Sequence, residues 1–222
     1  MIPKSIHLVN KTQEIQDGYQ KYFNSIRDFH PQWNIKIYDD VEARRIVATE
    51  MPGMLEIYDS YERDIQRADI FRLIVVYLYG GFYMDLDMLC LREMDDLCSN
   101  QVVLGEEKTM TAEECREIGL RDQLRIANYM FGAIPGHPFL SDVINAAAER
   151  SRVKIMQEDD ILESTGPGLL TRIYHQHQGK YNDITLLANK TKKCMKWCDT
   201  ISCHFGDYAA HFHQGSWRWE NK

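Results

Sequence analysis

The spacing of apolar positions along this chain changes between the period of a strand and the period of a helix. Apolar residues recur at every second position in 33–38, and at every third or fourth position in 15–29. We expect strands at 2–9, 33–38, 82–84, 102–105 and within 128–134. We expect helices at 15–29, 41–49, 61–79, 139–150 and 166–174. Strands that alternate with helices predict an α/β fold with a parallel layer. Residues 106–125 are polar and show no clear period, so we expect a poorly defined segment there.

Four charged residues interrupt the most apolar part of the chain. Asp69 and Arg72 precede the diglycine at 80–81, and Asp85 and Asp87 follow it. The diglycine predicts the end of the long helix, because glycine adopts the left-handed conformation at a helix C-terminus. Burying charges among apolar side chains costs several kcal/mol per ion unless each is paired or bound to a metal. The segment therefore indicates a binding site.

Composition describes an ordinary globular protein. The 222 residues are 44% hydrophobic and 27% charged, which fits a single domain over 1–222. Lys and Arg number 26 against 33 Asp and Glu, and the net charge of −7 argues against binding to nucleic acid or to an acidic membrane surface. The sequence contains no apolar run of membrane-spanning length, and its start lacks the apolar core of a signal peptide, so we expect a cytoplasmic protein.

Asp85 and Asp87 stand two positions apart at the end of an apolar strand, so their side chains leave on the same side. Two converging carboxylates suit Mn²⁺ or Mg²⁺, which keep open positions for phosphate oxygens. A solvated turn is the alternative, because aspartate is common where strands end. Asp69 and Arg72 share one face of the expected helix. An ion pair on an exposed helix is the alternative there, but the surrounding residues are apolar, which favours a protected cleft where the pair bonds to sugar hydroxyls.

Cys194, Cys198, Cys203 and His204 lie within eleven residues of one another, which raises a zinc site as a second metal-binding alternative. The spacing lacks the paired C-x2-C of structural zinc sites, so free thiols are the better interpretation.

The motifs A-D-x-x-R at 68–72 and G-G-x-Y-x-D-x-D at 80–87 resemble the sugar-binding DXD region of glycosyltransferase family 32. That family includes the Och1-like mannosyltransferases and capsular polysaccharide enzymes. The opening I-P-K-S-I-H at 2–7, the T-G-P at 165–167 and the S-W at 216–217 also fall in the order of the family. The resemblance therefore spans nearly the whole chain.

This resemblance implies a GT-A type fold, in which a Rossmann-like mixed sheet flanked by helices binds a nucleotide-diphosphate sugar. It implies that Asp87 ligates Mn²⁺ or Mg²⁺ directly and that Asp85 contacts the ribose, or the metal through water. His211 matches a histidine of the C-terminal H-x-x-x-x-S-W pattern and would complete the metal shell. Asp69 and Arg72 would hold hydroxyls of the donor sugar.

The same resemblance assigns further substrate contacts. Asn128 would touch the donor sugar, and Ser216 and Trp217 would close over the diphosphate. Many relatives carry a tryptophan at the place of Asn10, where its ring can stack on the base, so the choice between UDP and GDP stays open. His7 lies near this position and is a further candidate for substrate contact, with a structural role in its strand as the alternative.

The implied reaction moves a hexose from a UDP- or GDP-linked donor to a glycan or other hydroxyl acceptor, with retention of configuration. Asp85, Asp87 and Arg72 would be the catalytic group, and the metal would offset the charge of the leaving diphosphate. Two alternatives stay open. One is a haloacid-dehalogenase-type phosphatase, in which the first aspartate of D-x-D is the nucleophile, and the other is a non-catalytic, metal-dependent sugar-binding module.

Overall fold

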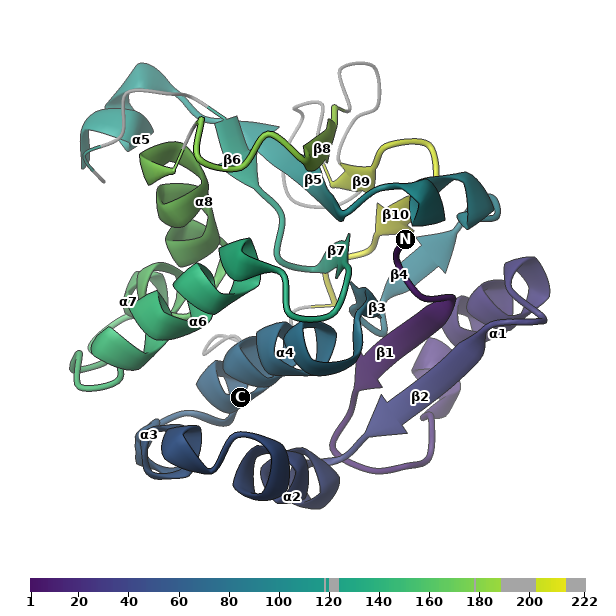
Figure 1. The fold of residues 1–222 in the computed structure, drawn as a ribbon, viewed down its shortest axis with the longest axis horizontal. Coiled ribbons are helices and arrows are strands. Elements are labelled where there is room, and N and C mark those ends of the chain that lie inside the picture. Colours follow the sequence, from purple (N-terminus) through teal and green to yellow (C-terminus); the bar gives the residue numbers. More distant parts are fainter. Residues whose placement is uncertain (118, 120–123, 178, 189–202, 215–222) are drawn as a thin grey trace.

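The computed structural model describes residues 1–117, 119, 124–177, 179–188 and 203–214. In this part of the chain, seven strands form a mixed sheet in the order β2-β1-β3-β7-β5-β6, with β8 paired to the other edge of β5 (Figure 1). β1 is parallel to β2 and β3, and β5 is parallel to β8, whereas β7 is antiparallel to β3 and β5, and β6 is antiparallel to β5. The strands are β1 (Ser5–Val9), β2 (Asn34–Tyr38), β3 (Gly81–Met84), β5 (Val102–Thr109), β6 (Leu124–Ile126), β7 (Met130–Ala133) and β8 (Ile184–Leu187).

Helices cover both faces of this sheet. They are α1 (Gln20–Phe29), α2 (Asp40–Glu50), α3 (Leu55–Ser60), α4 (Asp64–Tyr79), α5 (Ala112–Glu117), α6 (Pro138–Glu149), α7 (Glu158–Ser164) and α8 (Pro167–Gln176), with short 3-10 turns at Asp17–Tyr19, Pro52–Met54 and Asp95–Ser99. α2, α3, α4, α6 and α8 share one apolar core on one face, and α1 contributes to a second core on the other. None of the described helices has both the length and the apolar character of a membrane span.

Strand β3 lies between the two cores and contributes to both. Its side chains alternate, so Phe82 and Met84 pack into the core of α1 whereas Tyr83 packs into the core of α4. All four residues of β3 are buried. The strand is therefore a rigid support for whatever follows its C-terminal end.

The turn between α4 and β3 requires glycine, as the sequence predicts. Gly80 has a φ of 65° and Gly81 a φ of 91°, which other residues rarely adopt. A Cβ on Gly81 would lie 2.7 Å from the carbonyl oxygen of Ser5. β3 can therefore approach β1 only because position 81 has no side chain.

A second, small sheet forms on the α1 side of the main sheet. It contains β4 (Met88–Cys90), β10 (Ala209–His211) and β9 (His204–Phe205), all antiparallel, in the order β4-β10-β9. Phe205 packs against Gly105 of β5, where a Cβ would lie 2.6 Å from its ring. This contact fixes the small sheet against the main one.

The structure corrects several expected boundaries. β1 begins at Ser5 rather than at residue 2, and α4 begins at Asp64 rather than at residue 61. The excursion at 106–125 is partly ordered, because β5 continues to Thr109 by pairing with β6, and α5 lies between them. α3, α7, β8 and the small sheet were not expected from the sequence.

Candidate active site

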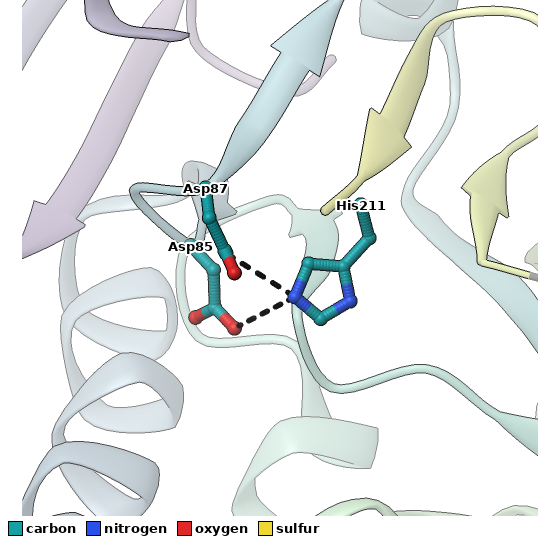
Figure 2. Close-up of side chains that lie close together, drawn as sticks. All are labelled: Asp85, Asp87 and His211. Atoms are coloured by element: carbon teal, nitrogen blue, oxygen red, sulfur yellow. Dashed lines mark ion pairs between the residues drawn. The ribbon is translucent and has the colours of Figure 1, made fainter. Parts of the chain in front are cut away.

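Asp85 and Asp87 lie in the turn that joins β3 to β4. The backbone N–H of Asp85 donates to the carbonyl of Tyr129 (2.8 Å), and the carbonyl of Asp85 accepts from the N–H of Met88 (3.1 Å). These bonds tie the turn to the main sheet and to the small sheet at once. Both carboxylates leave the turn on the same side, as the spacing predicts (Figure 2).

His211 faces these carboxylates from β10, where it is in register with Met88 of β4. Its Nε2 lies 3.2 Å from Oδ1 of Asp87 and 3.9 Å from Oδ2 of Asp85 (Figure 2). The imidazole ring stacks against the ring of Tyr129, with centroids 4.3 Å apart. Pairing of β4 with β10 thus brings His211 to two carboxylates that are more than 120 positions away in the sequence.

These three side chains fit a divalent cation. One atom from each of Asp85, Asp87 and His211 lies within 4.8 Å of the others. Carboxylate oxygens suit Mn²⁺ and Mg²⁺, and an added imidazole favours Mn²⁺. Nδ1 of His211 is buried and has no partner among the described residues, whereas Nε2 points to the carboxylates.

The pKa values of the three groups reflect this arrangement. Burial raises the pKa of Asp85, against the opposing effect of Arg72. Burial would also raise the pKa of Asp87, but the hydrogen bond and the charge of His211, together with the N–H of Gln214, outweigh it and the pKa is lowered. For His211 burial would lower the pKa, but Asp87 and Asp85 outweigh it and the pKa is raised. The imidazole therefore carries a proton more readily than usual, and a cation at this place would displace that proton.

Asp69 and Arg72 are on α4, one turn apart, and both are buried, at 4% and 5% exposure. Nη2 of Arg72 lies 3.0 Å from Oδ1 of Asp69, and Nη1 lies 3.5 Å from Oδ1 of Asp85. Nη1 also donates to the carbonyl of Asn128 (3.0 Å). Arg72 therefore connects the helix to the carboxylate turn, which agrees with a protected cleft rather than an exposed helix.

Asn128 and Thr165 complete the surroundings of Asp69. Nδ2 of Asn128 donates to Oδ1 of Asp69 (3.1 Å), and Oγ1 of Thr165 donates to Oδ2 (3.0 Å). Burial raises the pKa of Asp69 to about 6, against the lowering effects of Arg72, Thr165 and Asn128. At pH 7 the carboxyl is mostly ionised.

Tyr83 joins the two halves of the site, a role that was not expected from the sequence. Its hydroxyl donates to Oδ1 of Asp85 (2.5 Å), and its ring lies 4.7 Å from Cζ of Arg72. Burial raises the pKa of Tyr83 well above its ordinary value, so the hydroxyl stays protonated. A signal was present, since strand alternation puts Tyr83 on the same side of β3 as Asp85.

His7 has surroundings that differ from the expectation of substrate contact. It is buried and in register with Tyr83, but its ring reaches back to Gly80, just before β3, whereas Asp85 follows the C-terminal end of that strand. Nε2 lies 2.8 Å from the carbonyl oxygen of Gly80, and Nδ1 lies 2.9 Å from the hydroxyl of Tyr38. Burial lowers the pKa of His7 to about 4, so the neutral ring donates from Nε2 and accepts at Nδ1. Both nitrogens are used in the fold, which leaves His7 no atom for a ligand.

Two of the expected substrate-binding residues, Ser216 and Trp217, lie outside the described residues. The segment just before them is anchored at the site. The N–H of Gln214 donates to Oδ2 of Asp87 (2.7 Å), and the N–H of Phe212 donates to its carbonyl (3.0 Å). This contact of Asp87 had no signal in the sequence.

The two remaining expectations concern Asn10 and the cysteines. Nδ2 of Asn10 donates to the carbonyls of Thr12 and Glu14, so the side chain closes its own loop. Cys203 is buried, whereas Cys194 and Cys198 lie outside the described residues. Among the described residues, Asp85, Asp87 and His211 form the only group with metal-binding geometry.

Comparison with protein families gives a match over residues 16–104 to the glycosyltransferase sugar-binding region containing DXD motif. The chain is 28% identical over 200 residues to inositol phosphoceramide mannosyltransferase 2 of Schizosaccharomyces pombe, covering 87% of this chain and 54% of that protein. It is 32% identical over 173 residues to inositol phosphoceramide mannosyltransferase 3 of the same organism, covering 78% of this chain and 45% of that protein. The chain thus spans about half the length of these relatives.

Among solved structures, the PaToxG glycosyltransferase has a TM-score of 0.57 and 18% sequence identity, over 79% of this chain and 70% of that one. The UDP-bound glycosyltransferase domain of the YGT toxin has a TM-score of 0.58 and 8% identity, over 83% and 79%. The fold is of the GT-A type, which confirms the expectation from the sequence.

Proposed function

We propose that this chain, which belongs to the glycosyltransferases with a DXD-containing sugar-binding region, transfers a hexose from a nucleotide-diphosphate sugar to a hydroxyl acceptor. The observation that carries the proposal is the convergence of Asp85, Asp87 and His211 beside the buried pair of Asp69 and Arg72. The first group has the chemistry to hold a cation and a diphosphate, and the second has the chemistry to hold sugar hydroxyls.

Asp85, Asp87 and His211 would hold Mn²⁺ or Mg²⁺. When bound, the cation would supply positive charge to the diphosphate as the bond to the sugar breaks. Arg72 stands 3.5 Å from Asp85 and adds a fixed positive charge on the side of the sugar. Tyr83 keeps Asp85 in place by its hydroxyl.

Asp69, Arg72 and Asn128 would bind the hydroxyls of the donor sugar. A carboxylate offers about four acceptor positions, and three donors already reach Asp69, so about one position is left for a sugar hydroxyl. The carbonyl and the side chain of Asn128 are both tied to this group. The sugar would therefore meet a preorganised polar surface rather than flexible side chains.

The names of the relatives support mannose as the hexose and an inositol phosphoceramide headgroup as the acceptor. Transfer would retain the anomeric configuration by attack of the acceptor hydroxyl on the face that the diphosphate leaves. In support, the carboxylates of Asp69, Asp85 and Asp87 each accept a hydrogen bond from a neighbouring residue, which weakens them as nucleophiles.

A donor panel tests the proposal. UDP- and GDP-linked mannose, glucose and galactose are incubated with Mn²⁺, Mg²⁺ or EDTA, with and without inositol phosphoceramide, and release of nucleoside diphosphate is measured. We expect metal-dependent release with one donor, and a fall of at least about 10²-fold in Asp87→Ala, the loss typical of removing one electrostatic stabiliser. Asp59→Ala, which removes an exposed carboxylate paired with Arg44, serves as the control and keeps full activity.

Three results would overturn parts of this proposal. Full activity of Asp87→Ala would exclude the metal assignment. Release of phosphate from simple monoesters, without turnover of any donor, would favour the phosphatase. Binding of a glycan with no turnover of any donor would favour the sugar-binding module.

A further inference from the structure

Three separate segments of the chain meet at the carboxylate of Asp69. Arg72 approaches from the same helix, Asn128 from the link between β6 and β7, and Thr165 from the junction of α7 and α8. Arg72 and Asn128 share Oδ1, whereas Thr165 donates to Oδ2. Thr165 is therefore the side chain of the three that holds the second oxygen of the carboxylate.

Thr165 is well placed to hold that orientation. It is 3% exposed, and its N–H donates to the carbonyl of Ile161, which ends α7. Gly166 and Pro167 then begin α8, so the residue is fixed on both sides by helices. The hydroxyl has two acceptors within reach, Oδ2 of Asp69 at 3.0 Å and the carbonyl of Ile161 at 3.4 Å. The single proton goes to the nearer, charged acceptor, because such bonds are the stronger ones.

We propose that Thr165 is a positioning residue of the donor-sugar site. Its hydroxyl fixes the carboxylate of Asp69, and through that carboxylate it sets the directions of the Arg72 guanidinium and of the Asn128 amide. The inference rests on the proposed function, because it concerns the same sugar site. It gives the α7–α8 junction, which lies 96 positions from Asp69, a direct part in donor binding.

Loss of the Thr165 hydroxyl would act on Asp69 in two ways. Oδ2 would lose its donor in a buried setting, so the carboxylate would be free to rotate away from Asn128. The pKa of Asp69 would rise further, because the Thr165 bond is one of the effects that lower it. The charged and titratable groups that face Asp69 are Arg72, Asp85, Tyr83 and Tyr61, and the substitution of Thr165 removes none of these groups.

The neighbouring residue offers a matched control. Oγ of Ser164 accepts from Nε2 of Gln66 (3.3 Å), and both residues are 1% exposed. This bond also joins the end of α7 to α4, but it does not reach Asp69. Ser164→Ala therefore removes a buried hydroxyl from the same junction without touching the sugar site.

The experiment compares Thr165→Val, Thr165→Ser and Ser164→Ala in the full chain. Release of nucleoside diphosphate is measured against donor concentration and against pH, beside the thermal midpoint of each variant. In Thr165→Val we expect a fall of about 10- to 100-fold in kcat/KM for the donor, the range typical of removing a residue that orients a binding group. We also expect the acidic limb of its pH profile to move to higher pH. Thr165→Ser and Ser164→Ala stay within about threefold of the wild type, below the range of such losses.

A double mutant separates positioning from general destabilisation. In an Asp69→Asn background, Thr165→Val should have little further effect on kcat/KM, because the two residues act through one contact. If Thr165→Val does not fold, Thr165→Cys replaces it, since a thiol is a weak donor. Equal kinetic losses in Thr165→Val and Ser164→Ala, or additive losses with Asp69→Asn, would overturn the inference and leave the proposed function intact. No donor turnover by the wild type would overturn both.

Discussion

Replacing Arg72 with methionine tests the central ion-pair network. Methionine has a similar length and is unbranched, so it can fill the space beside Tyr83 without the charge. The change leaves two carboxylates, of Asp69 and Asp85, without the cation that both face at 3.0 and 3.5 Å. Breaking a buried pair by removing one partner costs about 3–5 kcal/mol. We expect the free energy of unfolding to fall by this amount at pH 8.

The loss should shrink as the pH falls. The pKa of Asp69 is about 6 in the folded protein, above its ordinary value of 3.8, so the folded state binds the proton more tightly than the unfolded state. For such a group stability rises as pH falls through the folded pKa. Arg72 lowers this pKa, and without Arg72 it is higher still. At a pH where the Asp69 carboxyl is protonated in both folded proteins, each unit by which its pKa is higher in the variant reduces the variant's loss of unfolding free energy by about 1.4 kcal/mol.

Urea unfolding of both proteins at pH 8, 7, 6 and 5 measures the effect. Arg44→Met is the control, because Arg44 forms an ion pair with Asp59 at 55% and 40% side-chain exposure. We expect the control to lose less than about 1 kcal/mol at every pH. A loss below about 1 kcal/mol in Arg72→Met at pH 8, or an equal loss at pH 8 and pH 5, would refute the reasoning.

Two further predictions concern the support beneath the site. Gly81→Ala should destabilise the protein by more than about 1 kcal/mol in thermal unfolding, because position 81 has a φ of 91° and no room beside Ser5. Gly53→Ala, with nothing within 4 Å of its Cβ, should change stability less, and equal effects would contradict this account. His7→Gln should reduce the loss of unfolding free energy that acid causes. Burial lowers the pKa of His7 from 6.5 to about 4, so the wild type loses up to about 3 kcal/mol of unfolding free energy as the pH falls through this range. Parallel curves of unfolding free energy against pH for the two proteins would contradict this.

Long elements with a strong pattern are predictable from this sequence. The helix expected at 139–150 is α6 (Pro138–Glu149), and the strand expected at 33–38 is β2 (Asn34–Tyr38). Short elements are not, because β9 has only two residues and β10 three, too few to show a period. The extension of β5 to Thr109 runs through charged residues, and only its pairing with β6 explains it.

The candidate site, too, is predictable only where its residues form a local pattern in the sequence. Asp69, Arg72, Asp85 and Asp87 are found from local spacing in an apolar segment. His211 was reached through the family resemblance, because its approach to Asp87 depends on the pairing of β4 with β10. No local pattern reveals that Thr165 bonds to Asp69, since the contact joins residues 96 positions apart.

The pairing of β10 with β4 also sets the order in which the site can be completed during protein synthesis. The Asp87 carboxylate meets Gln214, 127 residues later in the chain, so this part of the site waits until those residues have been made. At about 5–20 residues per second, the wait is roughly 6–25 seconds. A chain interrupted before β10 keeps both carboxylates but has no imidazole to join them. Retention of a cation by all three ligands would therefore distinguish chains that include β10 from chains that stop before it.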